Sequence, residues 1–195
     1  MEQVKLYDTT LRDGAQREGV SFSVVDKLNI ARKLDELGIH YIEGGWPGAN
    51  PKDSEFFARA GELGLRSAKL VAFGSTRHCN IKAEEDAGLA ELVASGARFV
   101  TIVGKASEPQ VTQVLETSLD ENLKMVAESV AYLVSRGITV FFDAEHFFDG
   151  YKAGKNYSLE VLRAAAAAGA DCLVLCDTNG GSLPQEVGEI IAEVK

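Results

Sequence analysis

The chain has no long apolar run, few cysteines and a deficit of positive charge. No segment approaches the roughly 20 consecutive apolar residues that a membrane-spanning helix needs. The first residues lack the basic and then apolar pattern of a secretory leader, so no signal peptide is expected. Because 29 acidic residues outnumber 20 basic ones, the formal net charge is −9. This balance argues against nucleic acid or an anionic membrane as a partner, since both bind clustered Lys and Arg side chains.

The three cysteines, Cys79, Cys172 and Cys176, follow no C-x-x-C spacing. An odd number of such cysteines argues against a disulfide scaffold and favours a reducing, cytoplasmic location. Cys172 and Cys176 fall in one predicted strand, where four residue steps separate their Cα atoms by about 13 Å. That separation is too long for a disulfide or a shared metal ion. We therefore interpret both as small buried hydrophobic residues.

What the sequence does contain is a regular alternation of short β-prone runs and longer stretches of helical periodicity. The predicted strands are Val4–Thr9, His40–Gly44, Ser67–Phe73, Phe99–Val103, Thr139–Ala144 and Cys172–Cys176. The predicted helices are Val24–Leu37, Pro51–Leu63, Ala83–Ser95, Leu119–Arg136, Leu159–Ala168 and Pro184–Val194. Each strand is thus followed by a helix, which indicates a parallel sheet covered by helices.

Local start and stop signals support these helices. Ser23 and Ser118 each precede a predicted helix, with an acidic residue three positions later as in a capping box. Ser158 and Ser182 are predicted to start the fifth and sixth helices in a similar way. Glycine accepts the left-handed conformation that closes a helix, and it follows the first five helices, at Gly38, Gly64, Gly96, Gly137 and Gly169.

Two folds fit this pattern. Polar residues cluster at the carboxyl ends of the predicted strands, where both an open doubly wound sheet and a (β/α)8 barrel place their sites. No G-x-G-x-x-G motif follows a strand, which weakens the case for a dinucleotide-binding fold. The residues alone leave the choice between the open sheet and the barrel undecided.

The stretch Val4–Gly19 begins apolar and then turns polar. It predicts a buried strand whose carboxyl end delivers Arg12, Asp13 and Gln16 to one place. A cation, a carboxylate and an amide this close together can bind a metal ion and polarise an oxygen on its ligand. The alternative interpretation is an Arg–Asp pair at a strand end, exposed to water.

Three motifs, taken together, resemble one known family. They are Asp8–Gly14 with Gln16, then Asp143–Lys152, and then Leu175–Gly181. The chain resembles the metal-dependent acyl-CoA Claisen-condensing enzymes, which include the isopropylmalate, homocitrate and citramalate synthases and the hydroxymethylglutaryl-CoA lyases. The last two motifs are most similar to the citramalate synthase branch. The resemblance implies an α/β fold of the (β/α)8 TIM-barrel class, and a homodimer for the full-length parent.

Only six βα units are predicted, whereas a closed barrel has eight strands and typically about 250 residues. We therefore expect residues 1–195 to form the N-terminal part of a TIM-barrel catalytic domain, without strands seven and eight. Unpaired groups at the edges of the first and sixth strands favour association, so we expect this segment alone to be oligomeric, aggregated or partly folded. We also expect it to lack synthase activity by itself.

The resemblance further implies a reaction and its central residues. Acetyl-CoA condenses with a small 2-keto acid, pyruvate being favoured, in a metal-assisted Claisen condensation. Arg12 polarises the keto-acid oxygen and stabilises the enolate, a task for a preorganised cation in a dry pocket. Glu145 assists proton transfer from the acetyl methyl group. Asp13 matches the family's metal-binding aspartate, for Mg²⁺, Mn²⁺ or Zn²⁺, but this sequence lacks the His-x-His motif that supplies the other ligands in relatives.

Four further residues are predicted to bind substrate, with Glu43 expected beside the arginine. Gln16 offers an amide, and Thr178 matches the family's donor to the keto-acid carboxylate. Asp143 and Glu145 alternate along one strand and so share a face, where two close carboxylates raise each other's pKa. Each residue also has a structural interpretation: a water-facing amide, a turn at Thr178, or a carboxylate bound to a neighbouring cation or amide.

Other functions remain as alternatives. One is an acyl-CoA C–C lyase that runs the reverse cleavage on the same barrel, although the last two motifs argue against it. A second is a noncatalytic remnant, because the metal-ligand set is incomplete. A third is a Schiff-base aldolase that uses Lys105 near the end of the fourth strand. Gln110 also stands where relatives often carry a histidine, so the substrate contacts of that loop are expected to differ.

Overall fold

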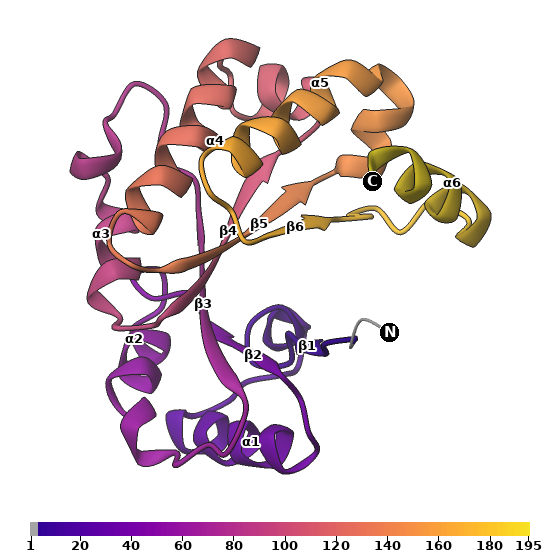
Figure 1. The fold of residues 1–195 in the computed structure, drawn as a ribbon. Helices are drawn as coiled ribbons and strands as arrows, with labels where there is room; N and C mark the ends of the chain where they lie inside the picture. The colour runs from indigo at the N-terminus through magenta and orange to yellow at the C-terminus, as the bar shows by residue number, and fades with distance from the viewer. Residues whose placement is uncertain (1–3) are drawn as a thin grey trace.

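The structure is a computed structural model that describes residues 4–195. One sheet contains six strands, all parallel, in the sequential order β1-β2-β3-β4-β5-β6. Their bounds are Tyr7–Asp8 (β1), Tyr41–Gly45 (β2), Lys69–Ser75 (β3), Phe99–Lys105 (β4), Thr139–Glu145 (β5) and Cys172–Leu175 (β6). Figure 1 shows that the sheet is strongly curved and that the helices lie on its outer side.

A helix follows each strand. The α-helices are Val24–Glu36 (α1), Pro51–Ala58 (α2), Ala87–Ala94 (α3), Leu119–Val134 (α4), Phe147–Ala167 (α5) and Pro184–Val194 (α6). Shorter helical turns lie in the connections, at Gly14–Gln16 (η1), Ala60–Glu62 (η2), Ala83–Glu85 (η3) and Gln110–Val114 (η4). A doubly wound sheet carries helices on both faces, whereas consecutive strand order with helices only outside is the barrel arrangement. The predicted TIM-barrel class is therefore confirmed, with six βα units in the described residues.

The predicted start and stop signals of the helices are confirmed where they depend on residues close together in the sequence. Ser23 and Asp26 form a complete capping box at the start of α1. Ser118 accepts a hydrogen bond from the backbone N–H of Glu121 at the start of α4. All the glycines predicted to close helices have positive φ, from 58° at Gly64 to 102° at Gly169. This conformation is nearly free of strain only for glycine, so these positions end the helices before the next strand.

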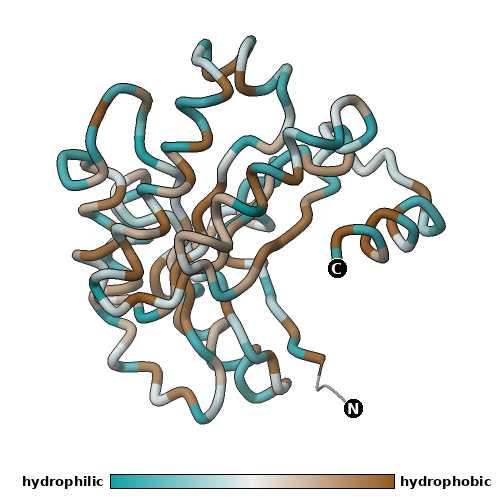
Figure 2. The backbone as a smooth tube through the Cα atoms, turned by 45° about the horizontal axis from the view of Figure 1, so that its top comes forward, coloured by the Kyte–Doolittle hydropathy of each residue, from teal (hydrophilic) through white to brown (hydrophobic). Residues whose placement is uncertain are grey.

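The strands bury alternate residues on opposite faces, as strand geometry requires. On the outer face, Val100, Ile102, Val140 and Phe142 are fully buried beneath the helices. Figure 2 shows the apolar residues concentrated along the strands, with polar residues over the surrounding loops and outer helix faces. This apolar layer between sheet and helices is the main core of the molecule.

The inner face is filled by aromatic rings toward the amino ends of the strands. The ring of Tyr41 lies edge-on to those of Phe99 and Phe141, with centroids 5.6 and 5.1 Å away. Tyr7 joins them, 6.1 Å from the ring of Phe141. Tilted and edge-on ring pairs of this kind are favourable aromatic contacts, although Tyr7 remains 36% exposed here. The cluster therefore closes the inner face from below and leaves polar chemistry to the carboxyl ends.

The prediction for α5 was wrong at its start: helical structure begins at Phe147 and not at Leu159, and a kink with non-helical φ and ψ at Gly154 divides α5 into two segments. Its first turns contain Gly150, which local sequence rules read as a turn residue. Here a Cβ atom on Gly150 would lie 2.4 Å from the carbonyl oxygen of Ala106, so glycine permits a close approach of helix and loop. Ser158 is therefore inside the helix, where its hydroxyl donates to the same Ala106 oxygen at 2.7 Å.

Smaller corrections concern the two ends of the sheet. Only Tyr7–Asp8 of the predicted first strand pairs with β2. Ser182 does not cap α6; its N–H donates to Asp177 at 3.0 Å, and Leu183 holds the cap position. Cys172 is exposed and Cys176 is half-buried, so the interpretation of both as buried was wrong. The reason is that β6 is an edge strand.

No helix in residues 4–195 combines the length and apolar character needed to span a membrane.

Candidate active site

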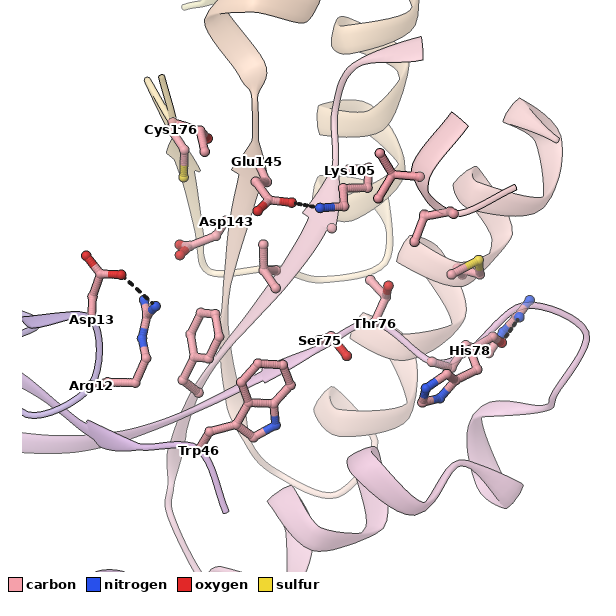
Figure 3. Close-up of a pocket in the computed structure, with 18 of the residues that line it drawn as sticks. Arg12, Asp13, Trp46, Ser75, Thr76, His78, Lys105, Asp143, Glu145 and Cys176 are labelled. Carbon is pink, nitrogen blue, oxygen red and sulfur yellow. Dashed lines mark hydrogen bonds and ion pairs between the residues drawn. The ribbon is translucent and has the colours of Figure 1, made fainter. Parts of the chain in front are cut away.

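A cavity of about 840 Å³ opens at the carboxyl ends of the strands. Figure 3 shows side chains from separate strands pointing into it. The predicted residues that line it are Arg12, Asp13, Gln16, Asp143, Glu145 and Thr178. They are far apart in the sequence and meet because parallel strands of a curved sheet present their carboxyl ends at one rim. The structure thus brings together every predicted site residue except Glu43, which lies beneath the cavity.

Arg12 is held in one orientation by three neighbours. Its Nε donates to Glu43 Oε2 at 2.6 Å, and its Nη1 lies 3.2 Å from Asp13 Oδ1. Its guanidinium carbon lies 3.7 Å from the centroid of the Phe73 ring, so the cation stacks on an aromatic face. A guanidinium fixed in this way keeps its remaining N–H groups for an oxygen in the cavity.

Glu43 supports this arginine from below and is only 1% exposed. Its second oxygen accepts a hydrogen bond from the Tyr7 hydroxyl at 2.8 Å, and that hydroxyl is 2.7 Å from Thr101 Oγ1. Burial raises the pKa of Glu43, while Arg12 and Tyr7 oppose that rise. Burial and the carboxylate of Glu43 also raise the pKa of Tyr7. Glu43 therefore acts through the arginine, because its carboxylate does not reach the cavity.

Asp143 is a cavity carboxyl with an unusual ionisation. Burial, followed by the nearby charge of Glu43, raises its pKa from 3.8 to about 7, and Arg12 only partly offsets this. Close to neutral pH, a large fraction of Asp143 therefore carries a proton. A neutral carboxyl can donate a hydrogen bond to a substrate oxygen, which a carboxylate cannot do.

Glu145 forms an ion pair with Lys105 through its Oε2 atom. The two residues are register partners at the last positions of β4 and β5. Both line the cavity, and Figure 3 shows their side chains meeting there. A Schiff-base nucleophile needs a neutral amine, so a lysine paired with a carboxylate argues against the aldolase alternative.

Thr178 lies in the loop after β6 and is fixed by the end of β5. Its Oγ1 accepts a hydrogen bond from the backbone N–H of His146 at 2.8 Å, which leaves its O–H free to donate. His146 has a left-handed φ of 56°, a conformation uncommon for a non-glycine residue. Asp177 anchors the same loop by accepting from Ser182, and Asn179 donates to Asp149 at 2.7 Å.

Residues 3–195 match the HMGL-like family over nearly the whole chain. This chain belongs to the HMGL-like family. It is 57% identical to the (R)-citramalate synthase of Aquifex aeolicus, across 100% of this chain and 37% of that protein. It is 53% identical to the (R)-citramalate synthase of Geobacter sulfurreducens over the same shares. The probable 2-isopropylmalate synthase of Methanopyrus kandleri is 38% identical, across 99% of this chain and 36% of that protein.

The HMGL-like fold is also found among solved structures. Hydroxymethylglutaryl-CoA lyase from Pseudomonas aeruginosa superposes with a TM-score of 0.75 at 22% identity, covering 98% of this chain and 63% of that one. These values show a shared fold. The identities to the synthases confirm the resemblance to the citramalate synthase branch. The chain spans 37% of the length of the Aquifex and Geobacter synthases.

The described residues of this HMGL-like chain do not form a metal site by themselves. Asp13 is the predicted ligand, and 64% of its side chain is exposed. Within residues 4–195, no three His, Cys, Asp or Glu side chains are grouped as a metal ion requires. Mg²⁺ and Mn²⁺ take several oxygen ligands, so one carboxylate beside an arginine does not fit such an ion without further donors.

Further residues line the cavity that the sequence did not predict there, although packing in the loop after β2 was the prediction for Trp46. The Trp46 ring lies edge-on to Phe73, with centroids 5.3 Å apart, and walls the side of the cavity below Arg12. His78 lines the rim, with Nδ1 2.8 Å from the buried carboxylate of Asp86. Neither contact has a local signal, because the partners come from different βα units. Cys176 also lines the cavity, where burial raises the pKa of its thiol to about 12.

Proposed function

We propose that this chain provides the keto-acid and proton-transfer half of an active site that condenses acetyl-CoA with pyruvate to give citramalate. The observation that carries the proposal is the Arg12 guanidinium, held by Glu43 and Phe73 at the rim of a cavity that Glu145 also lines. The whole-chain identity to (R)-citramalate synthases supports pyruvate among the small 2-keto acids.

The reaction needs a base and a site for developing negative charge. Glu145 takes a proton from the acetyl methyl group, and the electron pair of that C–H bond passes into the thioester enolate. The enolate carbon then attacks the keto carbon of pyruvate, and the C=O electron pair moves onto the keto oxygen. Arg12 faces that oxygen, where a fixed cation stabilises the transition state more than the ground state. A proton returns to the new alkoxide, and water then cleaves the thioester to release CoA.

Three residues are assigned to binding pyruvate and are not needed for bond making. Thr178 donates its hydroxyl to the keto-acid carboxylate, since its oxygen already accepts from His146. Gln16 offers an amide from η1, in the loop that follows β1. Asp143, in its neutral form, donates to a substrate oxygen. Together with Arg12, these groups provide the few fixed polar contacts typical of a small-molecule site.

Asp13 is proposed as one ligand of a divalent cation, with the other ligands supplied from outside the described residues. Such a cation stabilises negative charge on a bound oxygen. We also place the reaction in the cytoplasm, because all three cysteines are free.

The test uses the protein expressed from its complete reading frame. Release of CoA from acetyl-CoA is followed with a thiol reagent in the presence of pyruvate, 2-oxobutyrate, 2-oxoisovalerate or 2-oxoglutarate, and the products are identified by mass spectrometry. We expect pyruvate to give the highest kcat/KM and citramalate to form. If no keto acid accelerates CoA release, the proposal fails. Cleavage of citramalyl-CoA without condensation would instead support the lyase.

A further inference from the structure

The ion pair between Lys105 and Glu145 joins two residues at the same level of neighbouring strands. Lys105 ends β4 and Glu145 ends β5, and both side chains turn toward the cavity. The pair engages Glu145 Oε2 alone. Within residues 4–195, Glu145 Oε1 has no hydrogen-bond partner, so one oxygen of the carboxylate is held and the other remains available to the cavity.

Hydrogen bonds that involve α4 and α5 fix the backbone that carries this pair. Asn122 of α4 is fully buried, and its Nδ2 donates to the carbonyl oxygen of Lys105 at 2.9 Å and to the Tyr157 hydroxyl of α5 at 2.8 Å. On the other side, the N–H of Ala106 donates to the carbonyl oxygen of Glu145 at 3.0 Å. Buried hydrogen bonds of this kind fix backbone positions, since breaking one strands a polar group away from water.

A second lysine pair in the molecule shows what an ordinary surface contact looks like. Lys155 of α5 pairs with Glu193 of α6 on the outside, with side chains 43% and 55% exposed. The corresponding values for Lys105 and Glu145 are 20% and 26%. The ion pair of Lys105 and Glu145 is thus less exposed to solvent. Its residues lie on strands whose backbone is fixed by buried hydrogen bonds, and such rigid elements hold functional groups most accurately.

We propose that Lys105 is a positioning residue for Glu145: its ammonium fixes the carboxylate through Oε2 and directs Oε1 at the acetyl group. This rests on the proposed function of Glu145 as the base. In the step itself, Oε1 accepts the proton while the C–H electron pair enters the enolate. Lys105 keeps its protons and forms no bond to carbon. Loss of the ammonium leaves three rotatable side-chain bonds of Glu145 unrestrained, which lowers the rate of proton removal.

The experiment is a double-mutant cycle in the protein expressed from its complete reading frame. Lys105→Met, Glu145→Gln and the double variant are compared with wild type by kcat and KM for acetyl-CoA and for the four keto acids. We expect Lys105→Met to lower kcat about 100-fold and Glu145→Gln about 1000-fold. The double variant should be no slower than Glu145→Gln alone, because Lys105 acts through that carboxylate.

Three further variants make the cycle specific. Lys105→Arg keeps a cation able to bind a carboxylate and should retain kcat within about tenfold of wild type. Lys155→Met removes the exposed pair and should leave turnover unchanged. Thermal unfolding midpoints are measured for all variants, and Lys105→Gln replaces Lys105→Met if the latter unfolds early.

Several results would overturn the inference. If the fall in kcat of the double variant equals the product of the two single-variant falls, Lys105 acts independently of Glu145. A raised KM for the keto acid at unchanged kcat would make Lys105 a direct substrate contact. Irreversible inactivation by borohydride in the presence of keto acid would make it a Schiff-base nucleophile. If the wild type is active and Lys105→Met turns over at the same rate, this inference is refuted and the proposed function stands. If the wild type is inactive with every keto acid, the proposed function is refuted, and this inference with it.

Discussion

Two lysine–carboxylate ion pairs in this chain, Lys27 with Asp53 and Lys105 with Glu145, differ in how deeply they are buried. Lys27 of α1 and Asp53 of α2 are 4% and 5% exposed and pair between the helices and β2. Lys27 also donates to the carbonyl oxygen of Gly44 at 2.9 Å, and Asp53 accepts from the N–H of Trp46 at 2.8 Å. Both oxygens of Asp53 are therefore occupied by protein. The pair formed by Lys105 and Glu145 leaves one oxygen open to the cavity.

The comparison shows that a fully buried ion pair contributes to stability, whereas an ion pair at the cavity can take part in the reaction. A fully satisfied buried pair cannot accept a substrate, and its contribution is to fix the loop that follows β2. Gly45, the last residue of β2 before that loop, has a φ of 147°, and a Cβ there would lie 2.3 Å from the Asp53 side chain. The pair at the cavity rim is held through one carboxylate oxygen and keeps unused hydrogen-bonding capacity at the other. Changes to the first pair should affect stability, and changes to the cavity charges should affect activity.

The largest expected effect is on stability, from Lys27→Met. The change leaves the Asp53 carboxylate buried without its cation, which costs about 3–5 kcal/mol in the free energy of unfolding. Urea unfolding measures this loss. The matched control is Lys33→Met, which removes the exposed pair with Glu36 and should change stability by less than about 1 kcal/mol. Equal effects of the two variants would contradict the distinction between buried and exposed pairs.

Arg12→Lys should have the next largest effect, and it should appear in turnover. Lysine cannot reproduce a planar guanidinium that bonds Glu43 at its Nε and stacks on Phe73. We expect kcat in the complete protein to fall by about 100- to 1000-fold, as when a donor to a developing oxyanion is removed. Wild-type kcat in this variant would remove Arg12 from the reaction.

Asp13→Asn should have a smaller effect, confined to cation binding. The amide keeps the shape of the side chain but loses the negative charge that a hard cation prefers, so Mn²⁺ affinity should fall by about tenfold or more. Calorimetric titration of the complete protein with Mn²⁺ measures this. Because the side chain is largely exposed, the unfolding midpoint should stay close to wild type. Unchanged Mn²⁺ affinity would exclude Asp13 as a ligand.

The last predicted effect, spread over about three pH units, is a pH dependence of stability from Asp143. Its pKa is about 7 in the folded chain against an ordinary value of 3.8. Between these values the folded state binds more protons than the unfolded state, so this group makes stability fall as pH rises from about 4 to about 7 and adds no slope above that. Urea unfolding of wild type and Asp143→Asn across this range should show wild-type stability falling relative to the variant as pH rises, because the amide stays neutral at every pH. A constant difference would mean that the pKa is not raised.

The repeating fold was predictable because its signals are local. Capping by Ser23 and Ser118, and helix closure at glycines such as Gly64 and Gly169, depend on residues a few positions apart. The same rules failed for α5. Its start at Phe147 depends on a close approach between Gly150 and the loop after β4, and that loop lies on another βα unit.

The sequence by itself determined which residues reach the cavity, because alternation along a strand and position at its carboxyl end fix the direction of a side chain. That is why Asp143 and Glu145 on β5 and Arg12 after β1 could be predicted from the chain itself, whereas Thr178 was predicted from the family resemblance. The tertiary structure decided the geometry of their contacts and the cause of each pKa shift, and it alone showed that Glu145 pairs with Lys105. The contact of Arg12 with Glu43, the pKa of Asp143 and the pairing of Glu145 with Lys105 all arise between strands. Distance and burial set these interactions, and neither is encoded in the spacing of residues along the chain.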